Sequence, residues 1–107
     1  MGSGALRHRV TLLQLVQRDG ALGEVTASWS PVAVVWAQVR DLSGREWYEA
    51  RQLPEGEVST EVTIRFRAGV TRTMRVLHGT RTYDIIAVLD RDGGRKFLGL
   101  MCREAAP

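Results

Sequence analysis

The sequence has little of several features that define common protein classes. It has one cysteine, Cys102, in 107 residues, which excludes an internal disulfide and is typical of a reducing compartment. It has no uninterrupted apolar run near the ~20 residues that a membrane-spanning helix needs, so no membrane partner is expected. The N-terminus lacks the apolar stretch of a secretory signal, and residues 1–5 are expected to form a flexible leader.

Lysine is nearly absent as well. Lys96 is the single lysine, and arginine supplies the rest of the 15 basic residues. Arginine pairs carboxylates through a planar fork, which suits protein interfaces. The formal net charge of +3 permits contact with nucleic acid without predicting it. A chain of this length is expected to form one domain over residues 1–107, with a modest core.

Residues that could bind a metal or catalyse a reaction are few, and their spacing in the sequence does not match the motifs for these functions. His8, His78 and Cys102 offer three metal ligands, but without the close paired spacing of a zinc motif, so a turn histidine and a core thiol explain them better. Asp84 and His78 lack the nucleophile elbow that a catalytic triad would need. The segment 90–94 lacks the spacing and the terminal glutamate of a calcium loop. We therefore expect no metal, no cofactor and no enzymatic activity.

Short segments of alternating polar and apolar residues follow one another along the chain. Six strands are expected, at residues 7–17, 32–42, 58–67, 74–77, 81–89 and 96–103. Residues 18–27 are expected to form an excursion loop. This spacing predicts a mainly β fold, a small six-stranded barrel or sandwich that is mostly antiparallel. The tail over residues 104–107 is expected to be frayed.

The alternation assigns side chains to the core. In the second strand, Trp36 faces away from the apolar row Val35, Ala37 and Val39. In the third, Thr63, Arg65 and Arg67 face away from Val62, Ile64 and Phe66. In the fifth, one face is expected to carry Tyr83, Ile85, Ala87 and Leu89. Phe66 and Tyr83 are thereby predicted to lie in the core.

One segment, residues 42–52, is expected to be a short helix between the second and third strands. Ser43 and Glu46 form a capping box, in which each side chain satisfies a backbone N–H of the first turn. Pro54 removes a backbone donor and Gly56 frees the backbone, so the helix is expected to end before them.

This helix is expected to carry a contact surface. Trp47 and Tyr48 occupy successive positions, about 100° apart around a helix, so at least one is expected to face a partner. A second candidate is a stripe of arginines at positions 65, 67, 72, 75 and 81. It fits a solvated strand face that discourages edge pairing, a surface for a carboxylate-rich neighbour, or one for nucleic acid. Aromatic residues do not interleave with it as a stacking platform requires, which favours protein over nucleic acid. The predicted interface residues are Arg45, Trp47, Tyr48, Arg51, Arg65 and Arg67.

Several segments occur in an order that spans nearly the whole chain: LRHRVT at 6–11, VWAQV at 35–39, LSGRE at 42–46 with the helix to residue 52, TIRFRAGVT at 63–71, MRV at 74–76 and RTYDI at 81–85. In this order they resemble the phage head–tail joining proteins, also termed head-closure or stopper proteins, of long-tailed phages and gene transfer agents. The resemblance implies a small β-barrel with one helix between the second and third strands.

The resemblance also implies a function. The protein would be a structural connector subunit of a phage or phage-like particle, assembled in the bacterial cytoplasm, that retains DNA and docks the tail. It would self-associate into a ring, six- or twelve-fold with six-fold favoured. An adaptor or portal protein would lie above, a tail terminator or tail tube protein below, and DNA would pass through the channel.

In such proteins the connection between the second and third strands faces the channel. Gate candidates are therefore Leu53, Pro54, Glu55, Gly56 and Glu57, and the alternative for this segment is an exposed turn with solvated acids. The alternative function is a small OB-like nucleic-acid-binding barrel, which would bind single strands as a monomer with steep salt dependence.

Overall fold

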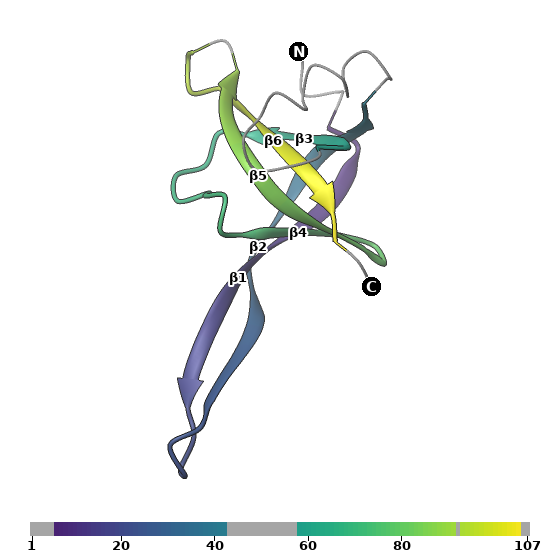
Figure 1. The fold of residues 1–107 in the computed structure, drawn as a ribbon. Helices are drawn as coiled ribbons and strands as arrows, with labels where there is room; N and C mark the ends of the chain where they lie inside the picture. The colour runs from purple at the N-terminus through teal and green to yellow at the C-terminus, as the bar shows by residue number, and fades with distance from the viewer. Residues whose placement is uncertain (1–5, 43–57, 92, 106–107) are drawn as a thin grey trace.

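A computed structural model describes residues 6–42, 58–91 and 93–105 of the chain. They form the strands β1 (His8–Asp19), β2 (Val25–Asp41), β3 (Thr60–Arg65), β4 (Arg75–His78), β5 (Arg81–Arg91) and β6 (Phe97–Glu104). The strands close a barrel in the order β1-β2-β3-β6-β5-β4, with antiparallel neighbours throughout (Figure 1). The mainly β, six-stranded antiparallel fold is thus confirmed.

The described ranges contain no helix, and so none that could span a membrane. Residues 43–52 of the predicted helix lie outside these ranges. The gate candidates at residues 53–57 lie outside them as well.

The core fills the inside of the barrel, as the alternation predicts. Apolar side chains from all six strands meet there, and each fully buried one contributes roughly 1.5–3 kcal/mol to folding. Val35 and Val39 contact this core, whereas Trp36 between them is 53% exposed. The buried members are Val10, Leu12, Ala37, Val62, Ile64, Met74, Val76, Tyr83, Ile85, Leu98, Leu100 and Cys102.

The outer face of β3 is buried too, which alternation alone does not predict. Glu61 and Thr63 point away from the barrel core, yet both are buried. A buried carboxylate is unfavourable unless it is paired. Arg40 on β2 supplies that pairing, since its Nη2 donates to Glu61 Oε1 at 2.7 Å.

β5 contains a bulge that inverts its alternation. Its pairing with β6 shifts register between Ile85 and Ala87, which leaves Ile86 as an extra residue. An extra residue moves every later side chain to the opposite face. The expectation that Ala87 and Leu89 continue the inward face is therefore wrong: Val88 contacts the core instead, and Leu89 is exposed.

The loop expected at residues 18–27 is mostly strand. β1 continues to Asp19 and β2 begins at Val25, so that only residues 20–24 connect them. This turn is closed by two backbone hydrogen bonds, from the N–H of Gly20 to the carbonyl of Glu24 and from the N–H of Gly23 to the carbonyl of Gly20. Gly23 adopts a left-handed φ of 85°. Glycine adopts that conformation without strain.

The β1–β2 hairpin extends well beyond the barrel. β4 pairs with β1 only at residues 11–13, and β3 pairs with β2 only at residues 37–41. The outer part of the hairpin therefore projects as a two-stranded ribbon (Figure 1), and the molecule measures 50 × 28 × 26 Å. We term residues 14–30 the arm.

The C-terminal end of β6 is better anchored than expected. The expectation that Glu104 begins a frayed tail is wrong, since this residue belongs to β6. Arg81 donates from Nε and Nη2 to the Glu104 carboxylate at 3.2 and 2.8 Å. The next residue, Ala105, donates its N–H to the carbonyl of Thr82. These cross-strand bonds account for the difference. Residues 106–107 lie outside the described ranges.

Candidate assembly surfaces

The structure describes two of the predicted interface residues, Arg65 and Arg67. Arg65 is the last residue of β3 and Arg67 follows in the connection to β4, and both are exposed. The remaining predicted interface residues, Arg45, Trp47, Tyr48 and Arg51, lie outside the described ranges. Interface and gate assignments there stay predictions.

A group of cations and aromatic rings forms where β3 ends and β6 begins. Arg65 pairs with Phe97 across the two strands, and its guanidinium carbon lies 5.9 Å from the centre of that ring. Phe66 donates its N–H to the carbonyl of Lys96 at 2.9 Å, and the Arg95 guanidinium carbon lies 5.9 Å from the Phe66 ring centre. We term the exposed set Arg65, Phe66, Arg67, Arg95 and Lys96 the cationic corner.

The core position predicted for Phe66 is wrong. β3 ends at Arg65, so the alternation stops before Phe66, whose side chain is 39% exposed. The break at Ala68 and Gly69 was the available sequence signal that the strand ends here. Sequence reasoning also missed Arg95 and Lys96, because only the β3–β6 pairing brings them beside Arg65.

The positive charges of the cationic corner are not neutralised by carboxylates of the described residues. Within the described ranges, none of its four cations forms an ion pair. In contrast, the arginines at positions 40, 75, 81 and 103 each meet a carboxylate within 4.0 Å. Arginines without a carboxylate nearby keep both their charge and their donors for a partner.

Two members of the predicted arginine stripe are neutralised on the barrel. Arg75 donates to Asp84 at 2.7 Å, and Arg81 binds Glu104. The hydrogen bonds with Glu104 raise the pKa of Arg81, and the same bonds lower the pKa of the Glu104 carboxyl. Arg65 and Arg67 of the stripe keep their charge for a partner and lie in the corner, so the predicted stripe is not one continuous surface of available charge.

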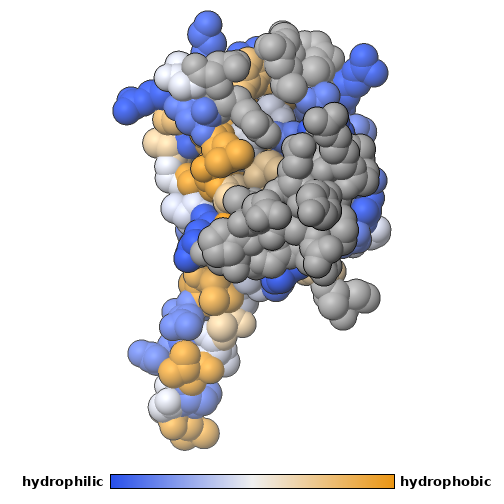
Figure 2. All heavy atoms as spheres, turned by 45° about the horizontal axis from the view of Figure 1, so that its top comes forward, coloured by the Kyte–Doolittle hydropathy of each residue, from blue (hydrophilic) through white to orange (hydrophobic). Residues whose placement is uncertain are grey.

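A second surface is the outer side of the β1–β2 hairpin, which exposes large apolar side chains. Leu22 at the tip is 93% exposed and Val25 is 63% exposed. Figure 2 shows hydrophobic residues recurring along the projecting arm. Of eight exposed large hydrophobic residues in the described ranges, six belong to this hairpin: Leu15, Leu22, Val25, Val32, Val34 and Trp36.

The register of β1 and β2 makes the arm amphipathic. Directly paired residues share a face, and successive residues alternate between faces. One face carries Leu15 with Trp29, Gln17 with Ala27 and Asp19 with Val25. The opposite face is mostly polar and carries Gln14 with Ser30, Val16 with Ser28 and Arg18 with Thr26. The apolar face continues the outer face of the barrel, where Thr11 pairs with Val34 and Arg9 with Trp36.

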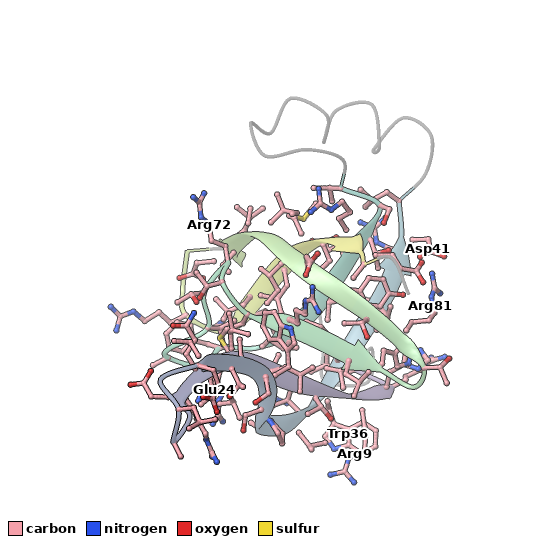
Figure 3. The ribbon with its side chains drawn as sticks, turned by 60° about the horizontal axis from the view of Figure 1, so that its bottom comes forward. Arg9, Glu24, Trp36, Asp41, Arg72 and Arg81 are labelled. Carbon is pink, nitrogen blue, oxygen red and sulfur yellow. The ribbon has the colours of Figure 1, made fainter. Side chains whose placement is uncertain are left out.

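The two outer-face tryptophans of the hairpin differ in their surroundings. The Arg75 guanidinium carbon lies 4.3 Å from the ring centre of Trp29, which is half-buried at the root of the arm. Arg9 and Trp36 project from the barrel (Figure 3), at 5.2 Å between guanidinium carbon and ring centre. Trp29 therefore fixes the arm to the barrel, whereas Trp36 is available for contacts.

The histidines and the cysteine do not form one site. The rings of His8 and His78 meet edge to face with centres 4.9 Å apart, but Cys102 lies inside the barrel. Burial raises the pKa of the Cys102 thiol to about 12. Across the described residues, no group of three or more histidine, cysteine, aspartate or glutamate side chains is placed to hold a metal ion.

Comparisons with known proteins agree with this barrel. A solution structure of protein SF1141 from Shigella flexneri 2a is similar, with 29% sequence identity and a TM-score of 0.82 over 99% of this chain and 98% of that one. A chain from the virion of a native gene transfer agent particle shares the fold, with 23% identity and a TM-score of 0.64 over 94% of this chain and 96% of that one. No curated protein matches the sequence.

The sequence matches the phage head completion protein family over residues 1–105. The match includes all six strands of the barrel and its projecting arm. The resemblance noted from the sequence motifs is thereby confirmed. The chain belongs to the phage head completion protein family.

Proposed function

We propose that this protein is a head-closure connector subunit of a phage or phage-like particle, where it forms a ring between the portal or adaptor and the tail. The ring retains the packaged DNA and docks the tail. The observation that supports this most directly is the family match over residues 1–105, on a barrel with two exposed surfaces suited to protein contacts. The role is structural rather than catalytic.

The two surfaces suit a subunit of a ring. Each subunit of a cyclic ring meets its neighbours through two different sides, so a small chain must use much of its surface as interface. Aromatic residues and arginine are enriched in interfaces and supply much of their binding energy. The apolar outer face of the hairpin and the cationic corner have this composition. Trp47 and Tyr48 are proposed to add a third contact, with one anchoring its segment and the other touching a neighbour.

The connection between β2 and β3 is proposed to face the channel. Glu55 and Glu57 place two carboxylates there, and DNA carries dense negative charge along its backbone. Carboxylates in a channel wall repel that backbone and keep DNA from adhering as it passes. Gly56 between them tolerates dihedral angles that other residues avoid, which permits the segment to swing between closed and open positions.

The test is to make particles without this chain. Particles from cells that lack it are expected to package DNA but to lose it, and to carry no tails. The parent chain supplied in trans should restore both properties. Normal tailed, DNA-filled particles without the chain would refute the proposal, and a purified monomer that binds single-stranded DNA with a steep salt dependence would favour the OB-like alternative.

A further inference from the structure

We infer that the arm of one subunit docks on the cationic corner of the neighbouring subunit. This inference rests on the proposed function only in placing the two copies side by side in a ring. It assigns the contact to two surfaces of this chain: the apolar face of the arm, with Asp19 and Glu24 near its tip, and the exposed set centred on Phe66.

Among the described residues, no third strand pairs with the arm, although a two-stranded ribbon needs further contacts to be stable. An isolated two-stranded hairpin is at best marginally stable in water, and its unpaired strand edges invite association. Beyond residue 13 of β1 and before residue 37 of β2, neither strand pairs with a third strand. The arm also turns one apolar face outward along its length. A second protein surface against that face would stabilise it.

The charges of the two surfaces are complementary. Asp19 lies on the apolar face of the arm, opposite Val25, whereas Arg18 lies on the polar face. Glu24 follows in the turn, and its carboxylate accepts the N–H of Leu22 at 3.1 Å. Among the described residues, neither Asp19 nor Glu24 forms an ion pair. A surface with unpaired carboxylates and apolar side chains fits one with unpaired cations and an exposed ring.

The arm cannot reach the cationic corner of its own chain. The register places Trp36 next to Arg65, because Ala37 pairs with Ile64 at the end of the β2–β3 ladder. From Trp36 to Glu24 the strand runs twelve residues, roughly 40 Å at about 3.3 Å per residue. The arm points away from the barrel throughout (Figure 1). The contact must therefore join two copies.

A contact between two different surfaces of the same chain is heterologous. Each copy offers its arm to one neighbour and its corner to the other, and such a contact generates a closed ring when the rotation between copies closes. The arm thereby becomes the element that joins subunits around the ring. The apolar face contributes contact area, and the charges at its tip select the corner over other surfaces.

The experiment uses intermolecular paramagnetic broadening on the full chain. A nitroxide is attached to unlabelled protein carrying Leu22→Cys, and this is mixed at millimolar concentration with ¹⁵N-labelled parent protein. The native Cys102 does not compete for the label, since it is buried and burial raises the pKa of its thiol to about 12. The matched control carries the nitroxide at Thr80→Cys, in the exposed β4–β5 turn.

The arm label is expected to cause loss of amide intensity at Phe66, Arg67 and Lys96 of the labelled copy, and the control label is not. Asp19→Arg in the spin-labelled copy or Arg67→Glu in the ¹⁵N-labelled copy should each reduce the loss, and the two variants mixed should restore it. Broadening confined to the arm would show that arms pair with one another, and broadening nowhere would show no affinity between the surfaces. Either result overturns the inference, while the particle test above still decides the proposed function separately.

Discussion

The guanidinium of Arg75 lies over the indole ring of Trp29, 4.3 Å from its centre, and so joins the root of the arm to the wall of the barrel. The same guanidinium donates to Asp84 at 2.7 Å. Arg75 thus connects β4, β5 and the arm, and its position is fixed by two partners at once. Because no third strand pairs with the arm among the described residues, this contact helps to set the direction in which the arm leaves the barrel.

Replacing Trp29 by alanine is expected to destabilise the protein. The contact with Arg75 contributes roughly 0.5–2 kcal/mol, and the lost contact area of a half-buried ring adds to it. Trp36→Ala is the matched control, since Trp36 is 53% exposed and should cost no more than about 1 kcal/mol. Urea denaturation of both variants measures the difference. Equal losses would show that Trp29 does not anchor the arm.

The buried thiol of Cys102 predicts a loss of stability in alkali. Burial raises the thiol pKa from 9.0 to about 12, so between these values the unfolded chain releases a proton that the folded chain keeps. The unfolded state then binds fewer protons, and the free energy of unfolding falls by about 1.4 kcal/mol per pH unit from this group. Cys102→Ala should show a shallower fall in denaturation experiments from pH 9 upward. An identical slope in the variant would contradict the assignment.

The pair of Arg81 and Glu104 predicts a loss of stability in acid. The hydrogen bonds from Arg81 lower the pKa of the Glu104 carboxyl, so the unfolded chain takes up a proton at a higher pH than the folded chain. The stabilisation is therefore present at neutral pH and is lost as the pH falls below 4.5 through the lowered value. Glu104→Gln should melt lower than the parent at pH 7 and approach it in acid. A constant gap between the two melting temperatures would refute this.

Charge at the proposed gate should affect DNA release alone. Replacing Glu55 and Glu57 by lysine is expected to leave folding and particle assembly intact but to slow DNA ejection, because lysines bind the DNA backbone that carboxylates repel. The double replacement by glutamine is the control and should release DNA faster than the lysine variant. Ejection from purified particles, followed by dye binding to DNA, measures the rate. Unchanged kinetics in the lysine variant would mean that these residues form an ordinary solvated turn.

The barrel was largely predictable because its strands alternate with a clear inward face. Ala37 and Ile64 lie where the pattern places them, and both are fully buried. The pattern fails in β5, where every residue from Ile85 to Leu89 is apolar. Such a run does not show which side chains face inward, so it does not mark the change of face at the Ile86 bulge. Phe66 shows the same failure at a strand end.

The arm and the cationic corner were hidden for a related reason. Strands in the arm contact no core, so small and polar residues such as Ala27 and Ser28 give no inward face and resemble a loop. The corner joins Phe66 to Arg95, which are distant in sequence and meet only because β3 pairs with β6. Local sequence patterns do not determine which residues of two distant strands pair with one another.

The most direct test of the connector role is a symmetry-averaged electron cryomicroscopy reconstruction of the junction between head and tail in the assembled particle. A ring of repeated densities is expected there, each fitted by the six-stranded barrel, with the arm of each copy lying on residues 65–67 and 95–96 of the next. A junction without this barrel, or a particle from which the chain is absent, would contradict the proposed connector role.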